Sequence, residues 1–502
     1  MKKSALAIAL IMVLAPLAFV PSAAAATEDE IEDSIEDGIE WLASQQNETG
    51  FWGDCEDDIP AITGLALLKL VDRARELGVD PFDPGEYKYA ENVIDGFEWL
   101  ESQKKVRNAN DSETNDNGQG IYFTCGGHET YNTAIALMAF ANLNGYDEYN
   151  ETLVQDMVDW FVDTQNDDGA WRYSSLEDPE SDNSNTGYAV IGLAYAENAG
   201  AIIPNSVKTG LDSWVDVIQD PVTGGSWYTP SWAWVNCLKT GNLILEMGFV
   251  GDTTESERLN DAIDYLVVHW NDTSFVGNID MTGWKPYNYQ AMYCIMKGLE
   301  YMQIEEIGGI DWFEEISDYI VENQHADGYW DDDPWAKYTE TPRILSTEWA
   351  LLTLEKVTVI KEIPVGFDVK PGSCPNPINI KSNGVQPMAI AGSEEFDVYD
   401  INVSTLKIGI CVNGEFTEFE GVAPLRWVYS DVTENYIPEE GEPCCIRTHP
   451  DGITDLSMKY DTQELVEAGL EDYGKNDELC LCIKGTTYDG EQFVGRDCII
   501  IK

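Results

Sequence analysis

The chain of 502 residues carries 91 acidic and 29 basic side chains, which gives a formal net charge of −62 at pH 7. This charge disfavours nucleic acid, anionic lipid and polyuronate ligands. Hydrophobic residues make up 43% of the chain, which is enough for packed cores and excludes a disordered protein. Because the acids are spread along the whole sequence, we interpret them first as a solvated surface and second as possible cation ligands.

Residues 1–26 are predicted to be a secretory signal peptide. Lys2 and Lys3 precede an apolar run that ends at Val20, and the alanines up to Ala26 offer cleavage sites. No later segment has the roughly 20 consecutive apolar residues of a membrane-spanning helix. We therefore expect a secreted or cell-surface protein whose mature chain has no transmembrane segment. Attachment to the cell envelope would require another device.

Residues 27–357 contain a unit of about 50 to 60 residues that recurs six times. Its clearest copies have an aromatic residue, a glutamine four or five positions later, and then Gly-x-aromatic. The first copy is Trp41, Gln45 and Gly50-Phe51-Trp52, and the last is Tyr319, Gln324 and Gly328-Tyr329-Trp330. Each marker ends an amphipathic helix, as in the helix that a Thr27 and Glu30 capping box would open.

A second, more uniformly apolar helix follows each marker. These helices are predicted over residues 61–70, 133–141, 187–196, 233–246, 290–301 and 346–356. Helices that are apolar all round are buried, whereas amphipathic helices are half exposed. Six of each in alternation predict an inner ring inside an outer ring, which is an (α/α)6 toroid.

This repeat resembles that of the terpenoid cyclase and protein prenyltransferase superfamily, which includes the squalene cyclases. The resemblance implies an α/α toroid but no particular chemistry, because related barrels also carry polysaccharide lyases, glycosidases and binding domains. The Asp-x-Asp-Asp motif with which the cyclases protonate an alkene has only an imperfect match here, at Asp54-Cys55-Glu56-Asp57. The prenyltransferase zinc motif is incomplete, since Cys294 has no Asp two residues before it.

The inner helices of such a toroid are parallel, so the residues at their N-termini share one mouth. The candidate catalytic acids there are Asp54, Glu56, Asp57, Asp58, Glu129 and Glu348, although acids before a helix also serve as caps. The candidate ligand-binding residues are Trp232, Trp234, Trp284, Tyr287, Tyr289, His128 and Arg343, and the alternative for the aromatic ones is ordinary packing.

Two sequences have the spacing of metal ligands. Cys125 and His128 have zinc-like Cys-x-x-His spacing but lack a second pair. Asp111, Glu113 and Asn115 loosely resemble a calcium loop without its final Glu. We therefore expect no cofactor and leave calcium open at the acidic loops.

After a linker at 358–366, residues 367–502 are predicted to form a cysteine-rich β-sandwich with about seven short strands. Seven cysteines follow residue 357, so a disulfide framework would leave one thiol over. The stretches Phe367 to Ser373, Pro387 to Ile390 and Phe396 to Val398 resemble a β-domain appended to many secreted archaeal and bacterial proteins. That resemblance implies no catalytic role.

These observations favour an exported, non-catalytic binding protein with a glycan, peptide or apolar ligand at the toroid mouth. One alternative is an enzyme on the same toroid, either a glycan hydrolase with paired carboxylates or an isoprenoid cyclase. A structural component of the cell envelope is the other. A deep, dry, aromatic cavity would favour a cyclase, and an open groove with paired acids would favour a glycan hydrolase. A filled barrel would favour a structural role.

Overall fold

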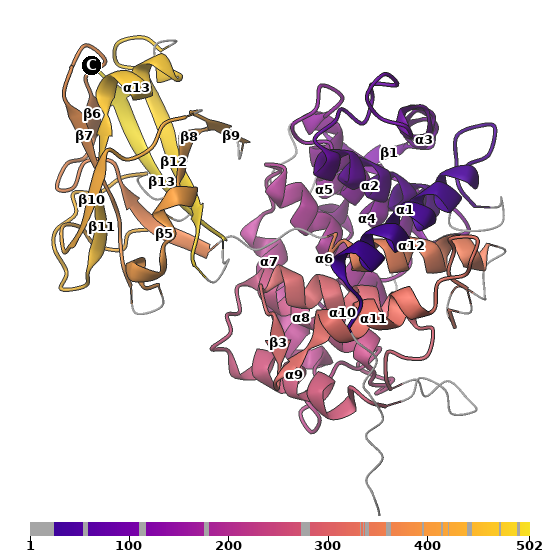
Figure 1. Ribbon diagram of the computed structural model, residues 1–502. Coiled ribbons are helices and arrows are strands. Elements are labelled where there is room, and N and C mark those ends of the chain that lie inside the picture. Colours follow the sequence, from indigo (N-terminus) through magenta and orange to yellow (C-terminus); the bar gives the residue numbers. More distant parts are fainter. Residues whose placement is uncertain are drawn as a thin grey trace, which may run out of the picture.

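The computed structural model describes residues 25–53, 59–109, 117–174, 180–272, 282–331, 333–334, 336, 341–357, 363–393, 396–412, 415–419, 421–438, 444–470, 473–488 and 492–502. Within them, a helical domain is followed by a β-rich domain (Figure 1). No helix in these ranges has both the length and the apolar character needed to cross a membrane. The proposed signal sequence up to residue 24, the Asp54 to Asp58 segment and the Asp111 to Asn115 loop lie outside the described residues.

The helical domain contains the predicted six pairs of helices. Its elements are α1 (Glu28–Ser44), α2 (Ile59–Leu77), α3 (Ala90–Ser102), α4 (Glu129–Ala141), α5 (Glu151–Thr164), α6 (Asn183–Asn198), α7 (Asn205–Ile218), α8 (Cys237–Val250), α9 (Glu257–His269), α10 (Tyr289–Tyr301), α11 (Trp312–Glu322) and α12 (Pro342–Leu354). Short hairpins, β1–β2 (Lys105–Asn108, Gln119–Tyr122) and β3–β4 (Glu306–Ile307, Ile310–Asp311), lie between them.

The odd-numbered helices have one buried face, as helix α1 illustrates. It begins with the predicted capping box, in which Glu30 N donates to Thr27 Oγ1 at 3.3 Å and Thr27 N donates to the Glu30 carboxylate at 2.9 Å. Ile35, Ile39 and Leu42 are buried at helical spacing. This face packs inward, and the opposite face carries the acids.

The even-numbered helices form the inner ring. Each contacts the next, from α2 to α4, α6, α8, α10 and α12, and α12 contacts α2, so the ring closes. Neighbours run parallel, because corresponding positions meet: a Cβ at Gly64 of α2 would press on Ile135 of α4, and one at Gly241 of α8 would press on Cys294 of α10. The six N-termini therefore lie at one end of the ring.

The repeated glutamine joins each unit to the next one. Gln165 Nε2 donates to Gly169 O at 2.7 Å and to Val207 O of the following outer helix at 3.0 Å. Gln324 of the last unit makes the same bonds to Gly328 O at 3.0 Å and, across the ring closure, to Ser34 O of α1 at 2.7 Å.

The glycine after each of these glutamines is required by space and conformation. Gly328 has φ +94°, and a Cβ there would collide with the Asp37 carbonyl oxygen of α1. The next aromatic is held from both sides, as in Trp330, whose Nε1 donates to Ile320 O at 2.8 Å and whose backbone N donates to Thr347 Oγ1 at 3.1 Å.

Three details of the prediction were wrong. In the first unit the joining side chain is Gln46, which donates to Gly50 O and Asn92 O at 2.8 Å, while Gln45 bonds only within its own helix turn. Helix α8 begins at Cys237 and not at Ala233, because Asn236 caps it by accepting from Lys239 N. Strand β5 begins at Ile363, inside the predicted linker.

The C-terminal domain is built on one nine-stranded sheet with order β10-β11-β7-β5-β13-β12-β8-β9, and β6 pairs with β13. Its strands are β5 (Ile363–Asp368), β6 (Asn376–Ile378), β7 (Val385–Ile390), β8 (Lys407–Val412), β9 (Glu415–Glu418), β10 (Arg426–Ser430), β11 (Asp455–Asp461), β12 (Glu478–Thr486) and β13 (Gln492–Ile501). The start of β5 pairs with β13 and its end pairs with β7, so this strand joins the two halves around a shared apolar core. The domain is not all-β, since helix α13 (Thr462–Glu467) follows β11.

Three disulfides cross-link this domain, and one cysteine is left over as predicted. The bonds are Cys374–Cys445, Cys411–Cys482 and Cys444–Cys498, and Cys480 is a partly exposed thiol. Disulfides of this kind are typical of oxidising compartments.

Candidate functional site

The N-terminal ends of three neighbouring inner helices, α4, α6 and α8, are joined through the loops that precede them. Thr130 N of α4 donates to Tyr173 O at 3.2 Å, and Asn183 N of α6 donates to Tyr228 O at 2.9 Å. In each case the start of one inner helix is bonded to the loop that precedes the next inner helix. The loops before α4, α6 and α8 are therefore neighbours in space although about 50 residues separate them in sequence.

Aromatic side chains follow these three loops, and we call them the aromatic arc (His128, Tyr131, Tyr173, Tyr228, Trp232 and Trp234). The His128 and Tyr173 rings lie 5.1 Å apart between centroids. The hydroxyls of Tyr173 and Tyr228 are hydrogen-bonded at 3.0 Å. The Tyr228 ring lies 5.2 Å from that of Trp232, so the arc is continuous across the three loops.

The outer end of the arc is an indole pair. The Trp232 and Trp234 rings stack with centroids 5.6 Å apart and an interplanar angle of 28°. Trp232 is 53% exposed, which is unusual for so large an apolar side chain. The Glu180 carboxylate fixes this loop by accepting from Ser231 N and Ser231 Oγ, both at 2.6 Å.

A buried lysine supports the indole pair from below. Lys239 Nζ lies 3.7 Å from the centre of a Trp234 ring. Lys239 is only 2% exposed, and burial lowers its pKa well below the ordinary value. Its amine has no hydrogen-bond partner among the described residues. The indole pair is therefore packed, at Trp234, against a buried amine whose basicity is reduced.

One carboxylate lies buried behind the arc. Asp182 caps α6, accepting from Asn185 N at 2.9 Å, Asn185 Nδ2 at 2.8 Å and Ser184 Oγ at 2.8 Å. Burial raises its pKa in spite of these bonds, and the Arg172 guanidinium lies 3.8 Å away. Because both carboxylate oxygens already accept hydrogen bonds, Asp182 serves as a helix cap in this arrangement.

The axis of the toroid is occupied by side chains below the rim. Tyr188 of α6 accepts from Trp349 Nε1 of α12 at 3.2 Å, and these helices stand on opposite sides of the inner ring. The Tyr131 ring of the arc contacts Tyr188, with the ring centroids 5.1 Å apart, and Lys297 Nζ lies 4.4 Å from the Tyr188 ring centre. A ligand at the mouth therefore meets Tyr131 and Tyr188 before it reaches the interior.

Glu348, one of the predicted acids, is fully buried on α12. Neither carboxylate oxygen has a hydrogen-bond partner among the described residues, and burial raises its pKa well above the ordinary value. It is therefore a side chain of the interior whose surroundings favour the uncharged form. Glu129, the other described candidate, opens helix α4 at the rim and is half-buried.

The other predicted aromatic residues are distributed around the fifth inner helix. Trp284 is fully buried between Trp270 and Tyr319, with ring centroids at 5.2 Å and 5.8 Å. Tyr289 is also fully buried, and Tyr287 is half-buried beside Tyr319 at 6.3 Å. The structure thus does not bring them together with Trp232 and Trp234 as one exposed stacking surface, because they fill the gap between α9, α10 and α11.

Arg343 and the Cys125–His128 pair have local partners. Arg343 Nε donates to Asp331 at 2.9 Å, and its guanidinium lies 4.6 Å from the Tyr329 ring centre. His128 N donates to Cys125 O at 3.1 Å in a tight turn. Neither Cys125 nor His128 belongs to the group with metal-ligand spacing found among the described residues.

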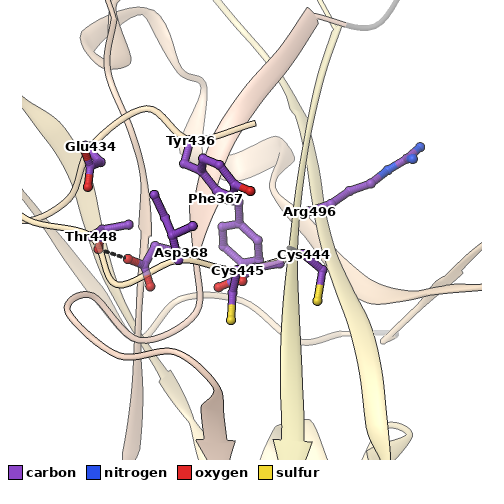
Figure 2. A pocket seen from close by; sticks show the side chains of 10 residues that line it. Phe367, Asp368, Glu434, Tyr436, Cys444, Cys445, Thr448 and Arg496 are labelled. Carbon is purple, nitrogen blue, oxygen red and sulfur yellow. Dashed lines mark hydrogen bonds between the residues drawn. The ribbon is translucent and has the colours of Figure 1, made fainter. Parts of the chain in front are cut away.

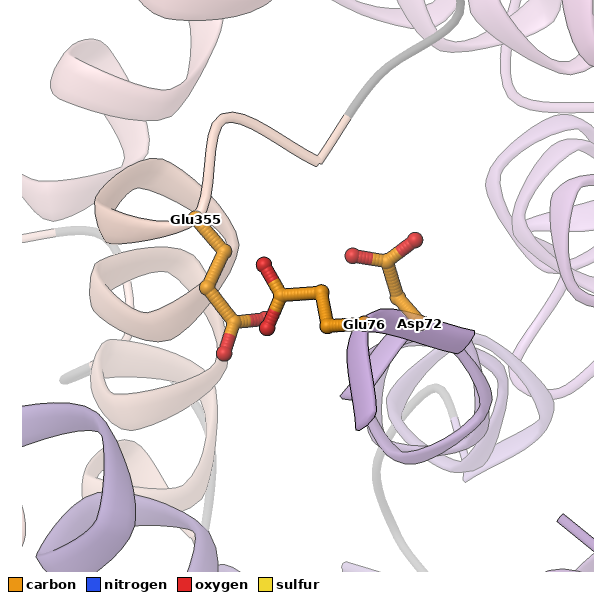
Figure 3. A group of neighbouring side chains, drawn as sticks. All are labelled: Asp72, Glu76 and Glu355. Carbon is orange, nitrogen blue, oxygen red and sulfur yellow. The ribbon is translucent and has the colours of Figure 1, made fainter. Parts of the chain in front are cut away.

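That group lies at the opposite end of the ring and consists of Asp72, Glu76 and Glu355. Figure 3 shows Glu355, the residue that follows α12, facing Glu76 and Asp72 of α2, and their oxygens lie within 4.8 Å of one another. Two basic side chains form ion pairs with these acids: Lys69 pairs with Glu355, and Arg73 Nη1 lies 3.0 Å from the Glu76 carboxylate. We therefore interpret the group as an ion network that fastens α12 to α2 at the ring closure.

The C-terminal domain has a small pocket beside its vicinal cysteines, with room for about one water molecule (Figure 2). Asp368 accepts from the hydroxyl groups of Thr448 and Thr433, and Asp497 accepts from Val369 N and Asn376 Nδ2, both at 2.7 Å. Burial, with Asp368 nearby, raises the pKa of Asp497 to about 7. The pocket is too small for an organic ligand, and its acids are held by internal hydrogen bonds.

Sequence reasoning missed Tyr131 and Tyr173 as members of the arc. Tyr131 lies three residues after His128, within the first turn of α4, and Tyr173 follows the repeat residue Trp171 by two positions. Both signals are present in the sequence, but only the hydrogen bonds between successive loops show which residues meet.

Comparison with known proteins is consistent with this architecture. Residues 18–236 match the family profile of the squalene-hopene cyclase C-terminal domain. No curated protein sequence matches the chain. The helical domain is thus a squalene cyclase-like toroid, with the pairs and the closure described above.

Solved structures with a similar fold include three enzymes or possible enzymes. An inactive variant of the α-1,6-mannanase GH76A of Salegentibacter sp. HEL1_6, in complex with α-1,6-mannotetrose, is 12% identical over 65% of this chain and 98% of its own, with a TM-score of 0.44. The type II terpene cyclase MstE from Scytonema is 12% identical over 65% and 97%, with a TM-score of 0.42. A possible GH105 family member from Klebsiella pneumoniae is 12% identical over 70% and 98%, with a TM-score of 0.40.

Proposed function

We propose that this squalene cyclase-like toroid belongs to an exported protein that binds a neutral glycan at the aromatic arc and catalyses no reaction on it. The observation that carries the proposal is the stacked pair of Trp232 and Trp234 at the rim, with Trp232 53% exposed. Flat aromatic faces beside hydroxyl groups bind the C–H faces of sugar rings while the sugar hydroxyls find polar partners.

The polar groups of the arc favour an uncharged ligand. The Glu180 carboxylate and the hydroxyls of Tyr173 and Tyr228 are polar groups that lie beside the ring faces. A net charge of −62 repels polyanions such as uronates. A neutral glycan satisfies both conditions, because its hydroxyl groups can bond to polar groups beside the rings and it carries no charge to be repelled.

The same groups support binding without turnover. The oxygens of Asp182 are engaged in capping α6, and Tyr188 bonded to Trp349 occupies the axis below the arc. A glycan hydrolase is the second candidate, because burial raises the pKa of Asp182 as a general acid requires. Loss of measurable hydrolysis in Asp182→Asn would favour that candidate.

The first test is binding of the mature protein to an array of neutral and acidic oligosaccharides. We expect neutral glycans to bind, and Trp232→Ala to weaken that binding about tenfold or more. Ile202→Ala is the control, since Ile202 is 59% exposed in the same domain but lies between the end of α6 and the start of α7, outside the arc. Equal array binding by Trp232→Ala and Ile202→Ala would reject the arc as the binding site.

Export is tested separately. N-terminal sequencing of the protein recovered from its native cells is expected to begin near Thr27. Recovery of a chain that retains Lys2 and Lys3 would contradict export through a cleaved signal. The three disulfides support an oxidising location but do not define it.

A further inference from the structure

Three tyrosines from separate segments of the C-terminal domain meet on its surface, and we call them the tyrosine platform (Tyr399, Tyr429 and Tyr488). Tyr399 lies in a short 3-10 helix, Tyr429 in β10, and Tyr488 just after β12. The Tyr399 and Tyr429 rings are 4.3 Å apart between centroids and tilted by 35°. Tyr488 N donates to Asp400 O at 2.7 Å, which fixes Tyr488 beside the Tyr399 segment.

The rings of this platform are presented to solvent. Tyr399 is 53% exposed and Tyr488 is 71% exposed, while the core of the same domain consists of aliphatic and phenylalanine side chains together with buried Tyr460. Burial and then the neighbouring Tyr488 and Tyr399 raise the pKa of Tyr429, in agreement with three phenols grouped at close range. Exposed aromatic groups of this size mark interaction sites more often than chance contacts.

The edge strand extends the platform. Strand β10 stands at the end of the sheet order, with β11 on one side only. Trp427 lies two residues before Tyr429 and so on the same face of β10, and it is 50% exposed. A row from Trp427 to Tyr429, with Tyr399 and Tyr488 beside it, offers several ring faces to one extended ligand.

The chemistry around the rings selects the kind of ligand. Asp397 caps the helix of Tyr399 by accepting from its backbone N at 3.0 Å, and Asp400 follows in the same helix. These carboxylates and the overall negative charge exclude polyanions. Phenols combine a flat apolar face with a hydroxyl, which suits a sugar ring better than a lipid chain.

We propose that the tyrosine platform is a second carbohydrate-binding surface, for neutral polysaccharides. It is independent of the aromatic arc, because it lies on a different domain and involves none of the same residues.

The test is native affinity electrophoresis of the full mature chain through gels that contain a mannan, a β-glucan or a xylan. The parent protein carries Trp232→Ala, which weakens binding at the arc. We expect at least one polysaccharide to retard this parent, and addition of Tyr399→Ala with Tyr488→Ala to weaken the retardation about fivefold or more. Val428→Ala is the matched control, since Val428 is 59% exposed on the opposite face of β10.

Two results would overturn the proposal. One is a tyrosine double variant that is retarded as strongly as its parent. The other is that none of the three polysaccharides retards the Trp232→Ala parent. This outcome counts against the proposal even if sedimentation then shows that the platform joins two copies of the chain. Retardation of the wild type but not of the parent would support the arc and reject the platform, so the two proposals fail separately. Tyr399→Phe with Tyr488→Phe, which keeps the rings, is expected to retain binding.

Discussion

Substitution of Gln324 by alanine would test the closure of the toroid, because this side chain joins the last helix pair to the first. Its Nε2 donates to Ser34 O at 2.7 Å and to Gly328 O at 3.0 Å, and its Oε1 accepts from Ser34 Oγ at 2.7 Å. Gln165 makes the corresponding bonds between two units that are consecutive in sequence, to Gly169 O and Val207 O.

The size of the effect follows from the bonds that are lost. A partly buried hydrogen bond contributes about 1 kcal/mol to the free energy of unfolding. Gln324→Ala removes three such bonds and is expected to lower that free energy by about 3 kcal/mol, whereas Gln165→Ala removes two and lowers it by about 2 kcal/mol. Gln45→Ala is the control, since Gln45 bonds only to Trp41 O and Ser44 Oγ on the surface, and we expect a change within about 0.5 kcal/mol.

Urea unfolding followed by tryptophan fluorescence measures these differences. Trp427 is the single tryptophan after residue 357 among the 16 in the chain, so the signal reports on the helical domain. The free energies are obtained by linear extrapolation to water. The closure would be refuted if Gln324→Ala had the same free energy of unfolding as Gln45→Ala while Gln165→Ala was destabilised. The first and last pairs would then not be joined in solution, and the domain would be an open superhelix.

Three further outcomes follow from the structure. Gly328→Ala is expected to destabilise the helical domain more than Gly126→Ala by urea unfolding, since both have positive φ but only Gly328 faces a neighbouring backbone; equal effects would contradict the close packing. In native alkylation followed by mass spectrometry, Cys237 and Cys294 should stay unlabelled until the chain unfolds, because both thiols are buried and burial raises their pKa. Asp497 has a folded pKa of about 7, above the ordinary value of about 3.9, so the stability it contributes is present below pH 4 and is lost as the pH rises through 7. In calorimetry of the C-terminal domain, Asp497→Asn should remove this loss of stability with rising pH. An unchanged loss would exclude Asp497 as its source.

The helical ring could be predicted because its signals are local and repeated. Periodic Ile35, Ile39 and Leu42 indicate a buried face, and the Gly-x-Trp turn recurs at the same point of each unit. The sequence pattern could not tell whether Gln45 or Gln46 joins the units, because the two adjacent residues are identical. They differ only in the side of the helix end that they face. That orientation depends on Asn92 in the next unit, which Gln46 contacts.

The candidate site was harder to predict because burial depends on neighbours far away in sequence. Trp232 and Trp284 look alike as aromatic residues before inner helices, yet Trp232 is 53% exposed and Trp284 is fully buried. The difference comes from the neighbours: Trp270 and Tyr319 enclose Trp284, whereas Tyr228 and Trp234 leave about half of Trp232 exposed. Disulfide pairing was out of reach for the same reason, since seven cysteines allow many connectivities.

The occupied axis links the architecture to the choice between binding and chemistry. A polyene substrate of a cyclase must enter a deep apolar cavity, but here Tyr188 and Trp349 of opposite helices are hydrogen-bonded across the ring below the mouth. Opening that path would break this bond and leave Trp349 Nε1 buried without a partner, which costs about 1 to 3 kcal/mol. A glycan on Trp232 and Trp234 needs no such movement, because the arc lies outside the bonded pair. The side chains on the axis therefore favour a ligand that stays at the rim.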